Sequence, residues 1–240
     1  MCEDSSGTIK ERNVAAYSSP EATELYIENA RSIGLSAAEK EVLDVFFTPP
    51  TGTVLDIGCG AGRTTRELVG RGFDVVGVDP SEPMIRAATD MFSDPSFQVA
   101  DAANLPFESD TFEYALFSSY GLDYVHPEAE RLAALEEIHR VLTPGGVFAF
   151  NTHNSWYNLP ALLLDRPFLK RLYIKSGNLL RLASPYKIAG HEFDVATYIS
   201  NPYRQRSQLR SCGFELLACV GKRSAPLKYL ERGPYFVART

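Results

Sequence analysis

Short apolar runs alternate with longer amphipathic segments through the middle of the chain. Between residues 53 and 150 the runs are four to six residues long, and the segments between them carry apolar residues at helical spacing. This alternation predicts parallel strands joined by crossover helices. We expect strands at residues 53–57, 74–78, 97–100, 112–117 and 147–150, and helices at residues 63–71, 81–92 and 127–142.

The residues before this pattern are predicted to form a helical arm. Residues 21–47 have a helical pattern, in which Ser36 and Glu39 have the spacing of a capping box. The segment Thr-Pro-Pro-Thr-Gly that begins at residue 48 is expected to end the last helix of the arm.

The last forty residues return to the pattern of the central part. A helix is predicted to begin at Asn201 and Pro202 and to end at Gly213, because Asn is a good cap, Pro fits the first turn and Gly terminates helices. Apolar runs at residues 214–220 and 235–238 predict two closing strands.

Together these elements predict an α/β protein with a doubly wound, mostly parallel, seven-stranded sheet of the Rossmann-like kind. The sequence between the fifth strand and the last helix interrupts the pattern and is rich in aromatic residues. It is expected to form a lid above the carboxyl edge of the sheet. The predicted organisation is an arm at 1–50, a core at 51–150, a lid at 151–200, and a final helix and hairpin at 201–240.

The composition is that of an ordinary globular protein. The 240 residues are 45% hydrophobic and 22% charged, with a net charge of −6. Because nucleic-acid-binding domains are usually basic, no nucleic-acid partner is expected. The polar, acidic N-terminus is unlike a secretory signal, and no apolar run approaches the length of a membrane span. The four cysteines lack metal-site spacing, so we expect no metal and a cytoplasmic location.

A glycine-rich loop follows the first predicted strand of the sheet. Gly58, Gly60 and Gly62 stand at alternate positions, and Asp56 precedes them by two residues. Glycines at a strand–helix junction let a ligand approach the backbone closely. Dinucleotide-binding proteins have a similar loop, so the glycines alone do not name the ligand. A carboxylate at this place favours a ligand with an ammonium and a sulfonium group.

Two further carboxylates end the next two predicted strands. Asp79 ends the second strand, 17 residues after Gly62, and is suited to accept hydrogen bonds from two ribose hydroxyls. Ser81, which follows it, is expected to cap the next helix. Asp101 ends the third strand and is suited to accept from an adenine amine. These positions predict an adenosine-containing ligand at the carboxyl edge of the sheet.

Four segments together carry a resemblance to a known family. They occur in the family's order over roughly residues 53–150: VLDIGCGAGRTTREL, VVGVDPSEPMI, VADAANLPFESDTFEYALFSS and EIHRVLTPGGVFAF. They resemble the methyltransferase type 11 and type 25 families of class I S-adenosylmethionine-dependent methyltransferases. The closing hairpin is similar to the terminal hairpin of that family, which a plain dinucleotide domain lacks.

The resemblance implies S-adenosylmethionine as cofactor and a role for each matching residue. The loop from Asp56 to Gly62 would hold the methionine part and Asp79 the ribose, while the backbone near Ser118 would line the reactive end. Adenine would lie beside Pro80, Met84, Asp101 and Ala102. The implied cofactor residues are Asp56, Gly58, Cys59, Gly60, Gly62, Asp79, Pro80, Met84, Asp101, Ala102 and Ser118.

The expected activity is in-line methyl transfer to an unidentified small molecule. The cofactor supplies the electrophile, and a base is needed only where the acceptor must first lose a proton. Two alternatives are an NAD-dependent oxidoreductase on a related fold and a binding module that keeps the cofactor site without turnover. Titration with S-adenosylhomocysteine and with NADH distinguishes a methyltransferase from the oxidoreductase. Incubation with labelled cofactor distinguishes an active enzyme from the binding module.

Three residues that follow the fourth and fifth strands are candidates for the acceptor side. His153 follows the fifth strand and is predicted to act as a base or as a substrate contact. A loop histidine bonded to backbone is an equally good interpretation. Tyr120 and Tyr124 follow the fourth strand and are suited to wall the acceptor pocket, and Tyr17 is suited to close over the cofactor. Aromatic packing without a role in the site is the alternative interpretation of these tyrosines.

The predicted lid carries an unusual concentration of positive charge. Residues 166–240 contain 14 Lys or Arg and 4 Asp or Glu, whereas residues 1–165 contain 10 and 26. Within residues 165–187 a helix capped by Asp165 is expected to carry much of this charge. Three interpretations remain open: neutralisation of the acidic core, an anionic acceptor, or contact with an anionic membrane that delivers a lipid-like acceptor.

Overall fold

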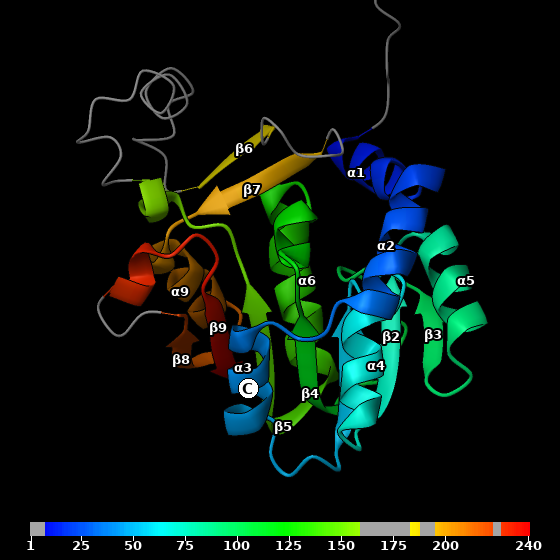
Figure 1. Cartoon of the computed structure of the whole chain (residues 1–240). Coiled ribbons are helices and arrows are strands. Elements are labelled where there is room, and N and C mark those ends of the chain that lie inside the picture. The colour runs from blue at the N-terminus through cyan, green and yellow to red at the C-terminus, as the bar shows by residue number, and fades with distance from the viewer. Residues whose placement is uncertain (1–7, 159–182, 188–194, 223–226) are drawn as a thin grey trace, which may run out of the picture.

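A seven-stranded sheet forms the centre of the protein, as the computed structural model shows (Figure 1). The structure describes residues 8–158, 183–187, 195–222 and 227–240. The strand order is β3-β2-β1-β4-β5-β9-β8, in which β9 alone runs antiparallel to its neighbours β5 and β8. The strands are β1 Thr53–Ile57, β2 Asp74–Asp79, β3 Ser96–Val99, β4 Phe112–Phe117, β5 Leu142–Asn151, β8 Glu215–Val220 and β9 Tyr235–Arg239.

Helices cover both faces of the sheet, so the predicted doubly wound α/β fold is confirmed. The helices are α1 Ile9–Tyr17, α2 Pro20–Ser32, α3 Ala37–Phe46, α4 Arg63–Gly70, α5 Glu82–Met91, α6 Glu128–Val141 and α9 Pro202–Ser211. Because successive side chains of a strand point to opposite faces, each strand packs on both layers. In β1, Leu55 and Ile57 pack with α6 and α9, whereas Val54 packs with α3 and α4.

The strand order of the sheet reverses next to β1, and the position of this reversal indicates where a ligand is expected to bind. Strand β1 pairs with β2 on one side and with β4 on the other. The crevice outside the carboxyl ends of these strands is the usual ligand position in open α/β sheets. Figure 1 shows α1 and α2 above this edge, together with the segment that carries β7.

The fifth strand is longer than predicted. It begins at Leu142, where the sequence predicted a helix end followed by a turn. Leu142 pairs with Phe112, and the regular register resumes only at Val147 opposite Tyr114. The residues between them, including Gly145 at φ +83°, leave the ladder as an irregularity that a sequence pattern reads as a turn.

The arm consists of separate helices rather than one helical stretch. Helix α2 ends at Ser32, and the predicted Ser36–Glu39 capping box is present at the start of α3. The additional helix α1 begins at the capping box of Thr8 and Glu11. Asn13 on α1 is 3% exposed, and its side chain donates to the carbonyl of Ala196 and accepts from its N–H, each at 2.8 Å. The arm is thereby bound to the insertion.

Part of the predicted lid is a two-stranded antiparallel sheet. Strand β6 (Ala183–Lys187) pairs with β7 (Ala196–Ser200). The predicted basic helix at 165–176 lies outside the described residues. No helix in the described ranges combines the length and apolar character that crossing a bilayer requires.

Candidate cofactor and acceptor site

The glycine loop joins β1 to α4 and depends on backbone conformations that favour glycine. Gly58, Gly60 and Gly62 have φ values of +63°, +54° and +89°. A Cβ atom on Gly58 would lie 2.7 Å from the ring of Phe117. The loop therefore has neither the space for a side chain at Gly58 nor a backbone conformation that suits side chains at the three glycines.

Asp79 ends β2 and faces the glycine loop. One carboxylate oxygen accepts from the N–H of Gly60 at 3.0 Å and the other from the N–H of Ser81 at 2.9 Å. Burial raises the pKa of this carboxyl to about 6, although both hydrogen bonds act to lower it. Ser81 stands at the N-cap position of α5 as predicted, but its side chain makes no cap hydrogen bond, and its hydroxyl accepts instead from Ser18 at 2.9 Å.

Asp56 lies inside the loop rather than on the surface it presents. The side chain is fully buried, and its Oδ2 accepts from the hydroxyls of Thr64 and Thr65 at 2.7 and 2.6 Å. Burial raises the pKa of this carboxyl to about 6. The other oxygen, Oδ1, is buried without a hydrogen-bond partner in the described part of the chain. One acceptor position beneath the loop is therefore still open.

A pocket opens above these residues at the carboxyl edge of the sheet. It contains about 900 Å³ of empty space, part of which is open solvent. Most of the cofactor residues implied by the sequence reach its wall. They are Gly58, Gly60, Asp79, Pro80, Met84, Asp101, Ala102 and Ser118, whereas Asp56, Cys59 and Gly62 lie behind it.

The N-terminal arm supplies the opposite wall of the pocket. Lys10, Asn13 and Tyr26 line it beside the expected Tyr17. Lys10 forms an ion pair with Asp101, the residue predicted to accept a hydrogen bond from the adenine amine. The ring of Tyr17 meets those of Tyr26 and Tyr124 at centroid distances of 6.0 and 5.2 Å. No local pattern predicted Lys10, Asn13 or Tyr26, because only the packing of the arm brings them here.

A buried ion pair supports the pocket wall at Ser118. Glu39 of α3 binds Arg63 of α4 at 2.7 Å and also accepts from the hydroxyls of Ser118 and Tyr235. Burial acts to raise the pKa of Glu39, but the hydrogen bonds from Arg63 prevail and lower it to about 2. Glu39 was predicted only as a capping residue, and its second role depends on strands far away in sequence.

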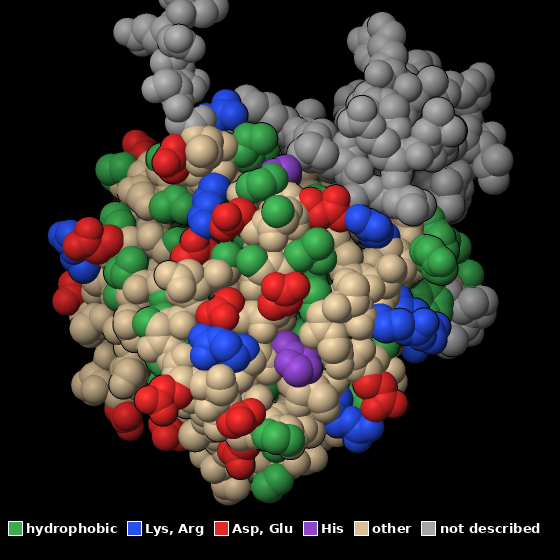
Figure 2. Space-filling model, turned by 180° about the vertical axis from the view of Figure 1, so that it is seen from behind, with side chains coloured by type: hydrophobic (Ala, Val, Ile, Leu, Met, Phe, Trp, Pro, Cys, Tyr) green, Lys and Arg blue, Asp and Glu red, His purple; other side chains and the backbone are tan. Residues whose placement is uncertain are grey.

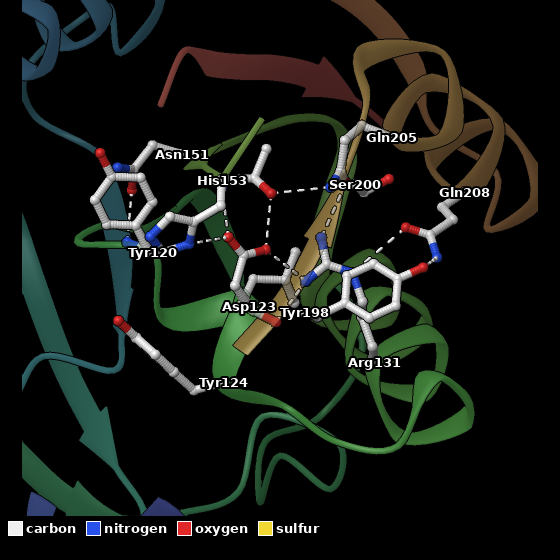
Figure 3. A network of polar contacts seen from close by, with 12 residues as sticks. Tyr120, Asp123, Tyr124, Arg131, Asn151, His153, Tyr198, Ser200, Gln205 and Gln208 are labelled. Carbon is white, nitrogen blue, oxygen red and sulfur yellow. Dashed lines mark hydrogen bonds and ion pairs between the residues drawn. The ribbon is translucent and has the colours of Figure 1, made fainter. Parts of the chain in front are cut away.

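Two of the acceptor-side candidates, Tyr120 and His153, lie together, but neither lines the pocket. The ring of Tyr120 stacks on His153 at a centroid distance of 4.0 Å and an interplanar angle of 22° (Figure 3). His153 is 6% exposed, and its Nδ1 lies 3.0 Å from Asp123 Oδ2. Their assigned roles stay predictions. The described residues contain no cluster suited to hold a metal ion.

Comparison with known proteins agrees with this geometry. The methyltransferase domain family matches residues 54–146. Malonyl-[acyl-carrier protein] O-methyltransferase of Salmonella typhimurium is 33% identical over 121 residues, which cover 49% of this chain and 47% of that protein. Demethylmenaquinone methyltransferase of Beutenbergia cavernae is 36% identical over 107 residues, covering 45% and 43%. The chain thus spans about half the length of the curated relatives it matches.

A solved structure extends the likeness over most of the chain. An S-adenosylmethionine-dependent methyltransferase from Methanosarcina mazei superposes with a TM-score of 0.66 at 20% identity, covering 87% of this chain and 99% of that one. At this identity the likeness concerns the fold alone. Residues 54–146 are therefore similar to a methyltransferase domain, and the fold of most of the chain is the one found in this solved methyltransferase.

Proposed function

We propose that this protein transfers a methyl group from S-adenosylmethionine to a small-molecule acceptor. The observation that carries the proposal is the pocket in which the glycine loop meets Asp79. The loop has no room for a Cβ atom at Gly58, and it faces the two acceptor oxygens of Asp79. This arrangement suits a ligand in which a ribose is joined to a group that packs against the backbone.

The residues present fit the cofactor part by part. Asp79 is assigned to the ribose, Pro80 and Met84 to the adenine ring, and the loop to the methionine part. The open oxygen of buried Asp56 supports this assignment, because an added donor from an ammonium group or a water would satisfy it. When bound, the cofactor supplies an electrophilic methyl group, and the chain supplies alignment and a water-poor site.

The remaining cofactor assignments use the far end of the pocket. Asp101 and Ala102 are assigned to the adenine edge, and Ser118 to the reactive end. Asp101 is already paired with Lys10, so an adenine amine would share or displace that contact. Cys59 and Gly62, which lie behind the wall, are assigned to shaping the loop.

The acceptor is proposed to enter from the side of β4 and β5, where Tyr120 and His153 lie. The relatives are named for methylating malonyl-acyl-carrier protein and demethylmenaquinone, so a carboxylate and a quinone are both precedents. The basic stretch at 165–187 suits an anionic or lipid-like acceptor. Acidic and basic side chains are interspersed over the described part of the face in Figure 2, which gives no support to a nucleic-acid acceptor. A cytoplasmic location fits this activity.

Two measurements on the purified protein test the proposal. Calorimetric titration should detect S-adenosylhomocysteine and no binding of NADH, and Asp79→Ala should weaken the former by at least about tenfold, as expected for a lost pair of ribose hydrogen bonds. Incubation with methyl-labelled S-adenosylmethionine and a metabolite extract should label a small molecule. NADH binding would favour an oxidoreductase, and cofactor binding without any labelled product would favour a module that has lost turnover.

A further inference from the structure

A buried polar network lies at the carboxyl ends of β4 and β5, beside the pocket rather than in its wall (Figure 3). At its centre Asp123 and Arg131 form an ion pair of 3.1 Å, and both side chains are fully buried. Asp123 belongs to the short helix η1 (Gly121–Tyr124) after β4, and Arg131 belongs to α6. Charges removed from water this completely persist only when they are paired and hydrogen-bonded.

The contacts of Asp123 determine where the proton of His153 resides. Its Oδ1 accepts from the Thr152 hydroxyl at 2.7 Å and from Arg131. Its Oδ2 accepts from the backbone N–H of His153 at 2.6 Å and lies 3.0 Å from Nδ1 of that residue. Because Asp123 accepts from Arg131, from Thr152 and from the His153 N–H, the contact with the ring is satisfied when Nδ1 carries the proton and donates it to Oδ2. Nε2 then keeps its lone pair.

The network holds the surrounding elements together without the imidazole. Arg131 also donates to the carbonyl of Leu122 at 2.5 Å and to Gln205 on α9 at 2.9 Å. Gln205 in turn donates to the Thr152 hydroxyl at 2.9 Å. Helices η1, α6 and α9 and the end of β5 are therefore joined by other residues. The ring of His153 adds one hydrogen bond to the contacts that join these elements, through Nδ1, and its Nε2 makes none within the described residues.

The backbone next to the pocket is continuous with Tyr120, the residue whose ring stacks on His153. Ser119 and Gly121 line the pocket, and Tyr120 between them in sequence stacks on the imidazole. Ser119 and Tyr120 have φ values of +53° and +63°, which L-residues rarely adopt. Strain of this kind is retained where a site requires a fixed placement. His153 thus stacks on a residue whose two chain neighbours, Ser119 and Gly121, line the pocket.

We propose that Asp123 is a positioning residue that fixes His153 with Nε2 free, and that His153 removes the proton of a hydroxyl or enol acceptor. The inference rests on the proposed methyl transfer and names its acceptor class. A carboxylate acceptor is already ionised at neutral pH and would need no base. The geometry therefore favours an acceptor that is protonated when it binds.

The proton and electron balance of the step is simple. The acceptor O–H bond breaks and its proton moves to Nε2 of His153. For a hydroxyl that is methylated on oxygen, the freed electron pair forms the new bond to the methyl carbon. For an enol that is methylated on carbon, the freed pair forms the C=O bond, and the pair of the C=C bond forms the bond to the methyl carbon. The bond from that carbon to sulfur breaks with its pair left on sulfur. The Asp123 carboxylate, 3.0 Å from Nδ1, stabilises the imidazolium that forms.

The test compares wild-type protein with His153→Gln and with His139→Gln. His139 is a matched control, because it lies on α6 against Phe214, outside the network. With methyl-labelled S-adenosylmethionine and a metabolite extract as probe, His153→Gln should slow labelling by at least about 100-fold, as for loss of a general base. His139→Gln should stay within about twofold of wild type, and both variants should bind S-adenosylhomocysteine within about twofold of it.

Two further readouts report on the chemistry rather than on the rate. The labelled product should resist alkaline hydrolysis, since an ether or a C-methyl group survives conditions that release methanol from a methyl ester. Nitrogen NMR of the S-adenosylhomocysteine complex should show the His153 proton on Nδ1. Asp123→Asn, if it folds, should move that proton to Nε2, because an amide group can donate to Nδ1.

The outcomes separate the inference from the function on which it rests. A base-labile product, a proton on Nε2 in the wild type, or His153→Gln labelling within about threefold of wild type would overturn the inference and leave methyl transfer standing. Loss of S-adenosylhomocysteine binding in His153→Gln would overturn it in favour of a structural role. Wild-type protein that binds S-adenosylhomocysteine and labels nothing would overturn the proposed function, and the inference with it.

Discussion

Replacing Arg131 by methionine should destabilise the protein more than most single substitutions. Arg131 is fully buried, pairs with Asp123 and stacks over the ring of Tyr198 at 4.7 Å. Removing one partner of a buried ion pair leaves the other charge uncompensated and typically costs about 3–5 kcal/mol. Asp123 keeps its contacts with Thr152 and His153, so a cost near the lower end, about 3 kcal/mol, is expected.

Urea unfolding followed by circular dichroism measures this cost. With a slope of about 2 kcal/mol per molar urea, the midpoint should fall by about 1.5 M without a change of slope. Arg86→Met is the control, because the Arg86–Glu82 pair lies on the surface, and its effect should stay within about 0.5 kcal/mol. A cost below about 1 kcal/mol for Arg131→Met would refute the view that a charged pair organises this region.

Two further predictions concern the cofactor pocket. Because the pKa of Asp79 is raised to about 6 and the ionised form accepts two ribose hydrogen bonds, affinity for S-adenosylhomocysteine should fall about tenfold from pH 7 to pH 5 as this carboxylate is protonated. Asp79→Asn should bind S-adenosylhomocysteine more weakly, and its affinity should change less with pH. An affinity of the wild-type protein that does not change between pH 7 and pH 5, measured by calorimetry, would contradict the assignment of Asp79 to the ribose. Gly58→Ala should lower the affinity for S-adenosylhomocysteine at least about tenfold, since the added Cβ atom would meet Phe117. Gly70→Ala is the control, because a Cβ atom there lies in open space and should leave this affinity unchanged. Equal affinities of the two variants would show that the loop tolerates a side chain.

The parts of the fold that depend on local sequence were predictable. The strand β1, the glycine loop and Asp79 follow from short-range alternation and from residue types that only a few backbone conformations accept. The irregular start of β5 was not predictable in this way. A Pro-Gly-Gly segment reads as a turn locally, and only pairing with Phe112 keeps Leu142 in the sheet.

The parts of the site that depend on distant partners escaped prediction. Arg131 lies in a helical pattern where an arginine is ordinarily exposed, and nothing nearby shows that Asp123 and Gln205 close around it. Lys10 and Asn13 reach the pocket only because α1 packs over it. His153 was recognised from its position after β5, but its bond to Asp123 spans 30 residues and needed the structure.

The central claim is that the chain transfers a methyl group from the cofactor held above its glycine loop. The most direct measurement counts S-adenosylhomocysteine and methyl-labelled small-molecule product in one incubation with a metabolite extract. If the chain transfers the methyl group, the two should accumulate in equal amounts, and both should be lost in Asp79→Ala. Bound cofactor that yields neither product, with wild-type protein at saturating cofactor, would contradict it.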